Sequence, residues 1–217
     1  MEYFVWKIKS WNLLIGVFHI IRFQHSYLRR ISQNFLTGFP GQIKINERNR
    51  KNRKSEFEKI KTISSLESCL AIGECGLDGL IAVNEDLQNE VFKTHMTWAE
   101  EIKKPIIIHC VRRFSQILHY KSAKVPLVVH GFNKKENVAK ELGDAGFYLS
   151  FGKAALENLS LQKVIKTFPI QRLFMETDDA DFEITKLNEK VAEIKSISLE
   201  NLKDQMWENL DQIVSNG

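Results

Sequence analysis

The sequence predicts an α/β protein whose parallel strands alternate with helices, the arrangement of a (β/α)8 barrel. From residue 68 to the C-terminus, short apolar runs alternate with segments of helical periodicity. This pattern is typical of repeated βα units and a parallel sheet. Several of the runs end at a side chain that can bind a metal, and the carboxyl ends of barrel strands meet on one face. The pattern therefore also predicts a pocket.

Five apolar runs are predicted to be strands. The unbroken apolar character of Pro105–His109 suits a strand that is buried on both faces. The predicted strands are Cys69–Gly73, Pro105–His109, Pro126–His130, Gly146–Phe151 and Arg172–Glu176.

Helical periodicity follows each of these strands. Asn84 is a suitable N-cap, because it precedes the acidic residues Glu85 and Asp86 in a first helical turn. The predicted helices are Asn84–Lys103, a short one ending near Tyr120, Lys134–Leu142, Ala155–Thr167, Asn188–Ile194 and Leu199–Val214.

The N-terminal part, residues 1–67, has a less regular pattern. Its apolar run from Trp11 to Ile21 contains His19 and is shorter than the roughly 20 apolar residues of a membrane span, so no membrane association is expected. We predict strands at Tyr3–Lys9 and Leu13–Ile21, and helices at Tyr27–Phe35 and Ser55–Leu66.

Length and charge limit the function classes. The 217 residues suit one domain, residues 1–217, although an eight-fold barrel typically has about 250. Residues 1–68 have a net charge of +8 (13 basic and 5 acidic residues), and residues 69–217 have −4 (18 and 22). The basic run Lys44–Lys54 could contact nucleic acid phosphates, or it could be a solvated loop.

The cysteines Cys69, Cys75 and Cys110 have neither Cys-x-x-Cys spacing nor an even number. They indicate neither a disulfide framework nor a structural zinc site. We expect reduced thiols in a cytoplasmic protein.

The candidate metal ligands are Glu74, His109, His130 and Asp178. Taken singly, Glu74 could instead form a salt bridge, and each histidine could be a core residue with satisfied hydrogen bonds. Their shared placement favours one divalent-ion site. Imidazoles favour zinc, whereas carboxylates favour magnesium or manganese. The remaining histidines lack this placement; His95 and His119, on predicted helices, are interpreted as structural.

Five ordered motifs carry a family resemblance. They are Ala71-Ile-Gly-Glu-Cys-Gly-Leu-Asp78, Pro105-Ile-Ile-Ile-His-Cys-Val-Arg112, Val129-His-Gly-Phe132, Gly146-Phe-Tyr-Leu-Ser-Phe-Gly152 and Met175-Glu-Thr-Asp178. Together they resemble the TatD family of metal-dependent deoxyribonucleases over residues 68–217. The resemblance implies a TIM barrel, a two-metal site and hydrolysis of DNA phosphodiester bonds by a metal-activated water.

The resemblance also implies residue roles. Glu74 matches the carboxylate that bridges the metals and is counted with the catalytic residues. His109 and His130 match the histidines on one metal. Asp178 matches the aspartate near the other metal, where it can act as general base. Arg112 lies near a basic residue of the family that would contact phosphate; alternatively it is a surface arginine.

One family signature is absent. Family members begin with a strand that ends in His-x-His, which this chain lacks, and the Gly-x-His-Pro turn survives only as Gly38-Phe-Pro40. We therefore expect an irregular or missing first strand and one bound ion rather than two. Three functions stay open: a nuclease acting on DNA or another phosphoester, an impaired or non-catalytic relative with one metal site, and an amidohydrolase of another substrate class.

Overall fold

The computed structural model describes residues 64–65, 69–178, 180 and 182–215. The elements predicted within residues 1–63, the basic run Lys44–Lys54 and Gly38-Phe-Pro40 lie outside the described residues, and of the predicted helix Ser55–Leu66 only residues 64 and 65 are described. The elements predicted after residue 68 can be compared with the structure.

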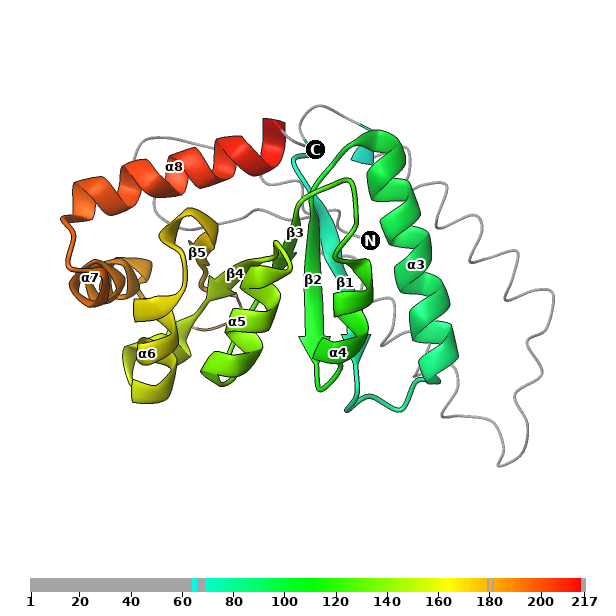
Figure 1. The fold of residues 1–217 in the computed structure, drawn as a ribbon, viewed down its shortest axis with the longest axis horizontal. Coiled ribbons are helices and arrows are strands. Elements are labelled where there is room, and N and C mark those ends of the chain that lie inside the picture. Colours follow the sequence, from blue (N-terminus) through cyan, green and yellow to red (C-terminus); the bar gives the residue numbers. More distant parts are fainter. Residues whose placement is uncertain (1–63, 66–68, 179, 181, 216–217) are drawn as a thin grey trace.

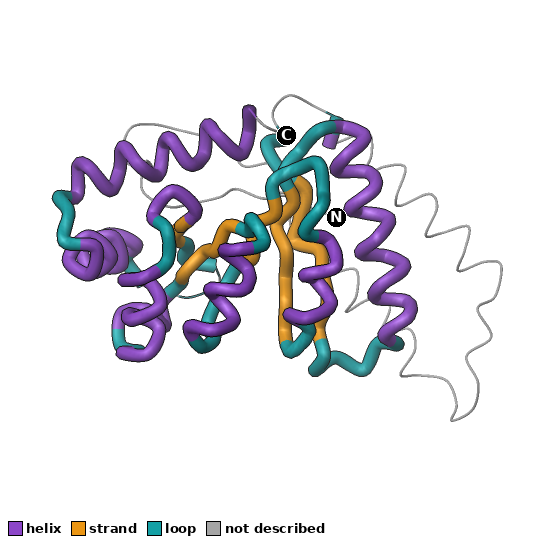
Figure 2. Tube along the Cα trace, in the orientation of Figure 1, coloured by secondary structure: helices purple, strands orange, loops and turns teal. Residues whose placement is uncertain are grey.

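The centre of the described part is a parallel sheet of five strands in the order β1-β2-β3-β4-β5 (Figures 1 and 2). Each strand pairs with the next one along the chain, which is the arrangement of successive βα units. The strands are β1 (Ile72–Asp78), β2 (Ile106–Val111), β3 (Leu127–Val129), β4 (Tyr148–Phe151) and β5 (Leu173–Met175).

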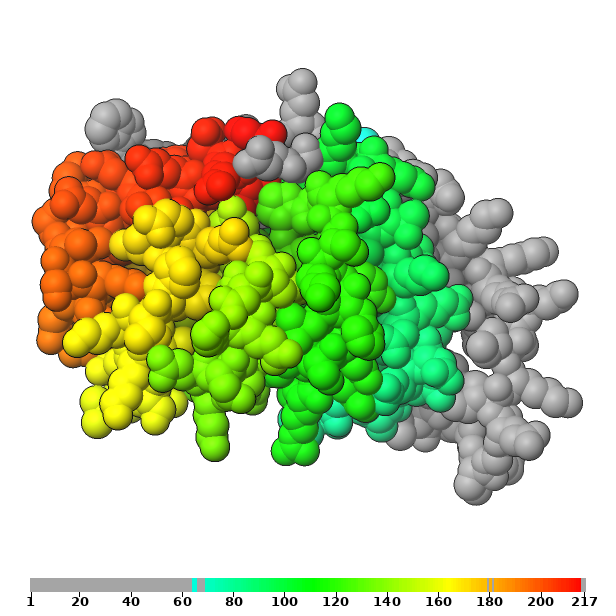
Figure 3. Space-filling model, in the orientation of Figure 1, coloured from blue at the N-terminus to red at the C-terminus, as the bar shows by residue number. Residues whose placement is uncertain are grey.

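A helix or a short helical turn follows each strand, and by the colour bar of Figure 3 the helical residues make up much of the coloured surface in that view. Asn84 caps α3 as predicted, because its side chain accepts a hydrogen bond from the Leu87 N–H at 3.1 Å. The helices are α3 (Glu85–Ile102), α4 (Phe114–Ile117), η2 (Leu118–Tyr120), α5 (Glu136–Asp144), η3 (Lys153–Leu156), α6 (Leu159–Thr167), η4 (Ile170–Arg172), α7 (Ile184–Lys195) and α8 (Leu199–Ser215).

The predicted helix Ala155–Thr167 is two elements, η3 and α6, so this prediction was wrong in its first turn. Asn158 separates them, because its side-chain oxygen accepts hydrogen bonds from the N–H groups of Ser160 and Leu161. An asparagine that accepts from the second and third residues of a helix starts a new helix there.

The core lies between the sheet and the helices. The central strands are buried on both faces: Ile106, Ile107 and Ile108 are at most 1% exposed. Alternate strand residues point to opposite faces, so burial of three in a row requires cover on both sides. The prediction from Pro105–His109 is confirmed in this respect.

Helix α8 is joined to the end of the sheet at which β5 begins. Asn209 on α8 is fully buried, and its amide donates to the carbonyl oxygens of Ile170 at 2.8 Å and Leu173 at 2.9 Å. The predicted metal ligands His109, His130 and Asp178 lie toward the opposite, carboxyl ends of the strands or after them. Helix α8 thus stabilises the sheet away from those residues. Within the described residues, no helix is long and apolar enough to cross a membrane.

Candidate metal centre

Glu74 lies inside β1 and not at its end, because β1 continues to Asp78. Two glycines bring β1 unusually close to β2: a Cβ atom on Gly76 would lie 2.0 Å from the carbonyl oxygen of His109, and one on Gly73 would lie 2.7 Å from that of Ile107. The register of the two strands also shifts between Ile72 and Cys75. Such an irregularity changes the direction of a side chain within a strand. The predicted strand end was therefore wrong, and β1 instead carries two acidic residues.

His109 lies within β2, and His130 follows directly after β3. The His130 N–H donates to the carbonyl oxygen of Ile108 at 3.1 Å, which extends the hydrogen bonding of β3 by one residue. The two imidazoles are thereby placed on neighbouring strands.

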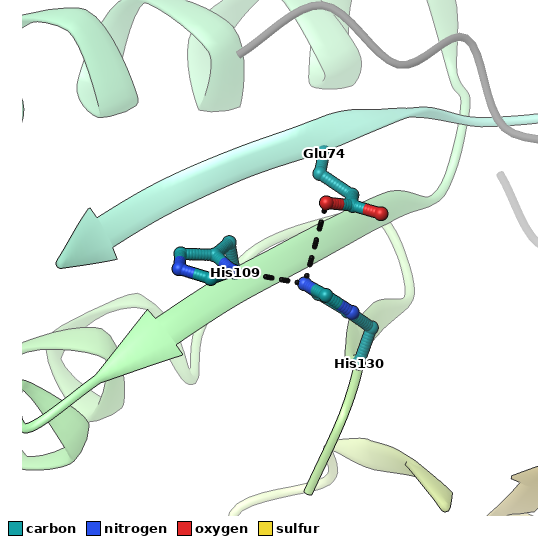
Figure 4. A group of neighbouring side chains, drawn as sticks. All are labelled: Glu74, His109 and His130. Carbon is teal, nitrogen blue, oxygen red and sulfur yellow. Dashed lines mark hydrogen bonds and ion pairs between the residues drawn. The ribbon is translucent and has the colours of Figure 1, made fainter. Parts of the chain in front are cut away.

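The side chains of Glu74, His109 and His130 converge from three strands (Figure 4). His130 Nε2 lies 3.0 Å from His109 Nδ1 and 3.5 Å from Glu74 Oε2. The side chains of Glu74 and His130 are 14% and 9% exposed, and that of His109 is 27% exposed. The structure thus brings together three of the four residues that the sequence predicted.

The fourth residue, Asp178, lies in a second group with His130 and Glu176. Asp178 is exposed and has a left-handed backbone with φ 46°. His130 belongs to both groups, since its Nε2 faces Glu74 and its Nδ1 lies 3.6 Å from Glu176 Oε1. The four predicted ligands therefore lie near one another, but they do not form a single set among the described residues.

Sequence reasoning did not assign Asp78 and Glu176. Asp78 Oδ2 lies 3.3 Å from His109 Nε2. Glu176 accepts hydrogen bonds from the Gly131 N–H at 2.7 Å and from the Ser150 hydroxyl. One signal was present, because Asp78 lies four residues after Glu74 and an even spacing places both on one face of a strand.

The two histidines differ in proton affinity. Burial and the neighbouring His130 lower the pKa of His109 below its ordinary value, although Asp78 opposes this shift. Burial also lowers the pKa of His130, but the carboxylates of Glu176, Glu74 and Asp178 together outweigh it and raise that pKa. A cation between these carboxylates would be favoured for the same reason that a proton is.

The donor set fits a divalent ion. If the neutral His109 carries its proton on Nε2, that N–H donates a hydrogen bond to Asp78. If His130 carries its proton on Nδ1, 3.6 Å from Glu176 Oε1, the facing nitrogens Nδ1 of His109 and Nε2 of His130 both present lone pairs. His109 Nδ1 and His130 Nε2 lie 3.0 Å apart, beside the Glu74 carboxylate. Their lone pairs repel one another unless a cation or a proton lies between them. Three protein ligands are the usual number at a catalytic zinc ion.

Other predicted residues lie apart from this cluster. Arg112 is exposed immediately after β2 and has a left-handed backbone with φ 58°. His95 is buried on α3, where its Nδ1 lies 2.8 Å from the carbonyl oxygen of Val91, and His119 is exposed on η2. The buried position of His95 agrees with its predicted structural role, whereas a structural role for the exposed His119 stays a prediction.

Comparison with known proteins identifies the family. The family model described as TatD related DNase matches residues 25–215. The chain belongs to the TatD family. Among relatives, the uncharacterized metal-dependent hydrolase YabD of Bacillus subtilis is 32% identical over 174 residues, covering 71% of this chain and 68% of YabD. The 3′-5′ ssDNA/RNA exonuclease TatD of Yersinia pseudotuberculosis is 30% identical, covering 62% of this chain and 55% of that TatD protein.

Solved TatD structures share the fold. A TatD-family hydrolase from Entamoeba histolytica has a TM-score of 0.65 and 19% identity, covering 79% of this chain and 72% of that chain. The TatD homologue YJJV from Escherichia coli has a TM-score of 0.67 and 17% identity, covering 75% and 71%. The predicted TIM-barrel-like α/β fold is therefore confirmed. The chain spans about half to two thirds of the length of the curated relatives it matches.

Proposed function

We propose that this chain is a metal-dependent phosphodiesterase of the TatD type that acts on nucleic acid, with one divalent ion held by Glu74, His109 and His130. The observation that carries the proposal is the convergence of two imidazole nitrogens and a carboxylate oxygen from β1, β2 and the residue that follows β3. Partly buried ligand atoms of this kind face one another at low cost only around a cation or a proton. His130 lies at the carboxyl end of its strand, the edge at which barrel enzymes build active sites.

Each residue has a role in the proposed reaction. A bound divalent ion would lower the pKa of water and neutralise phosphate charge. Asp178, exposed beside His130 and Glu176, would accept the proton of the attacking water. Arg112, exposed after β2, would contact a substrate phosphate. The family model and the printed activity of the Yersinia relative support nucleic acid as the substrate.

The direct test is hydrolysis of end-labelled oligonucleotides by the purified chain. We expect cleavage of single-stranded DNA with zinc, magnesium or manganese added, and none in excess chelator. Asp178→Asn should lower kcat by about 100-fold or more, because a general base contributes 10²–10⁴-fold. Asp204→Asn, a change of the same kind on the exposed surface of α8, should leave kcat unchanged.

Hydrolysis of bis(p-nitrophenyl) phosphate without cleavage of any oligonucleotide would support phosphodiesterase activity but exclude nucleic acid as the substrate. No hydrolysis of either compound, with metal bound, would contradict the proposal. It would favour the second candidate, a non-catalytic TatD relative. That candidate has support in the sequence, since the chain contains no His-x-His for a second ion.

Metal affinity should depend on pH through His130. Its pKa is raised in the metal-free protein, and only the neutral imidazole binds a metal. Below that raised pKa a proton competes with the ion, so affinity should fall by about tenfold per pH unit as the pH decreases. Competition with a chelator between pH 8 and 5.5, corrected for protonation of the chelator, measures this slope. A constant affinity across that range would contradict His130 as a ligand.

A further inference from the structure

Asp78 links the metal centre to helix α3. Its Oδ2 lies 3.3 Å from His109 Nε2, on the side of the ring opposite to His130. Its other oxygen, Oδ1, accepts a hydrogen bond from the Leu80 N–H at 2.8 Å. The two oxygens therefore have separate partners, and the side chain of Asp78 is only 12% exposed.

Gln88 on α3 holds the backbone of Asp78 from both sides. Its Oε1 accepts from the Asp78 N–H at 2.8 Å, and its Nε2 donates to the Asp78 carbonyl oxygen at 3.1 Å. Nε2 also donates to the carbonyl oxygen of Val83 at 3.0 Å. Gln88 is 3% exposed, and a buried amide with this many partners has one orientation. The position of Asp78 is therefore fixed by α3 and not only by its own strand.

We infer that Asp78 is a positioning residue that fixes His109 as a ligand through Nδ1, and that Gln88 holds Asp78 in place for this role. An ionised carboxylate only accepts hydrogen bonds, so Asp78 requires the proton of His109 to be on Nε2. The lone pair of the neutral ring is then on Nδ1, the nitrogen that faces His130. Carboxylates behind metal-bound histidines commonly set ring orientation in this way.

The hydrogen bond from the Leu80 N–H to Asp78 makes the inference testable, because it predicts an unexpected order of metal affinities for two variants of Asp78. In Asp78→Asn, that N–H requires the amide oxygen at the Oδ1 position, so the NH₂ group faces His109 Nε2. His109 must then accept at Nε2 and carry its proton on Nδ1, which blocks the metal nitrogen. In Asp78→Ala the ring loses the carboxylate at Nε2, so residue 78 no longer selects a tautomer. The asparagine variant should therefore bind metal more weakly than the alanine variant.

The experiment measures affinity for zinc by chelator competition in the wild type, Asp78→Asn, Asp78→Ala and the surface control Asp204→Asn. We expect about a 10–100-fold loss for Asp78→Ala, the range for outer-shell partners, a larger loss for Asp78→Asn, and none for the control. Gln88→Met should lose affinity without loss of any ligand atom. Equal or greater loss in Asp78→Ala than in Asp78→Asn would overturn the inference, because a structural role or direct ligation by Asp78 predicts that order.

A second readout does not depend on metal. The ¹⁵N chemical shifts of the His109 ring in the metal-free protein report the tautomer: we expect Nε2–H in the wild type and Nδ1–H in Asp78→Asn. The same tautomer in both proteins would overturn the inference. The inference rests on the proposed metal site, but different measurements would contradict the inference and the proposed function. A wild type that binds no divalent ion would contradict the proposed function, whereas the ring shifts would still decide the role of Asp78.

Discussion

Replacing Glu74 or His130 by alanine is expected to abolish tight metal binding, because each variant removes one of three converging ligand atoms. The purified wild type should hold about one divalent ion per chain, as a three-ligand site does. We expect an affinity loss greater than the 10–100-fold typical of residues behind the ligands. Metal content by mass spectrometry, together with chelator competition, measures both quantities.

His119→Ala is the matched control, since it removes an exposed imidazole on η2 outside the cluster. A ligand that binds only the folded state stabilises it by about 2.7 kcal/mol at 100 times its Kd. Zinc should therefore raise the thermal midpoint of the wild type and of His119→Ala, but not that of Glu74→Ala or His130→Ala. Unchanged metal content in both site variants would show that the ion is bound elsewhere.

The convergence of Glu74, His109 and His130 could be predicted from the sequence because it depends on topology. Residues near the carboxyl ends of neighbouring parallel strands reach the same edge of the sheet. This holds even where strand bounds are wrong: Glu74 is the third residue of β1 and His109 the fourth of β2, yet their side chains still meet His130.

The partners behind the ligands could not be predicted in the same way. Asp78 and His109 are 31 residues apart, and their contact depends on the register of β1 against β2. That register depends on the close approach at Gly76, which apolar periodicity does not encode. Gln88 is a polar residue on the buried face of α3, and periodicity does not assign a partner to a polar side chain there. Its hydrogen bonds to Asp78 and Val83 satisfy the buried amide.

The glycine that sets this register should be the most sensitive position outside the ligands. In Gly76→Ala, the new Cβ would lie 2.0 Å from the carbonyl oxygen of His109, a backbone atom in a buried strand that cannot rotate away. The strands must separate, so we expect a loss of about 3–5 kcal/mol in the free energy of unfolding, at the upper end for single substitutions. Thermal unfolding in chelator should then show a midpoint lower by about 10 °C, at 2–4 °C per kcal/mol.

Gly152→Ala is the matched control, because its Cβ would lie 3.7 Å from the nearest atoms, an ordinary contact, and its φ of −109° suits alanine. Its midpoint should stay near that of the wild type. Separation of β1 from β2 also moves Glu74 and Asp78 away from His109, so metal affinity should fall in Gly76→Ala even where the protein remains folded. A stable Gly76→Ala protein with wild-type zinc affinity would contradict this prediction, because it would show that the metal site does not depend on the close approach of β1 to β2 at Gly76.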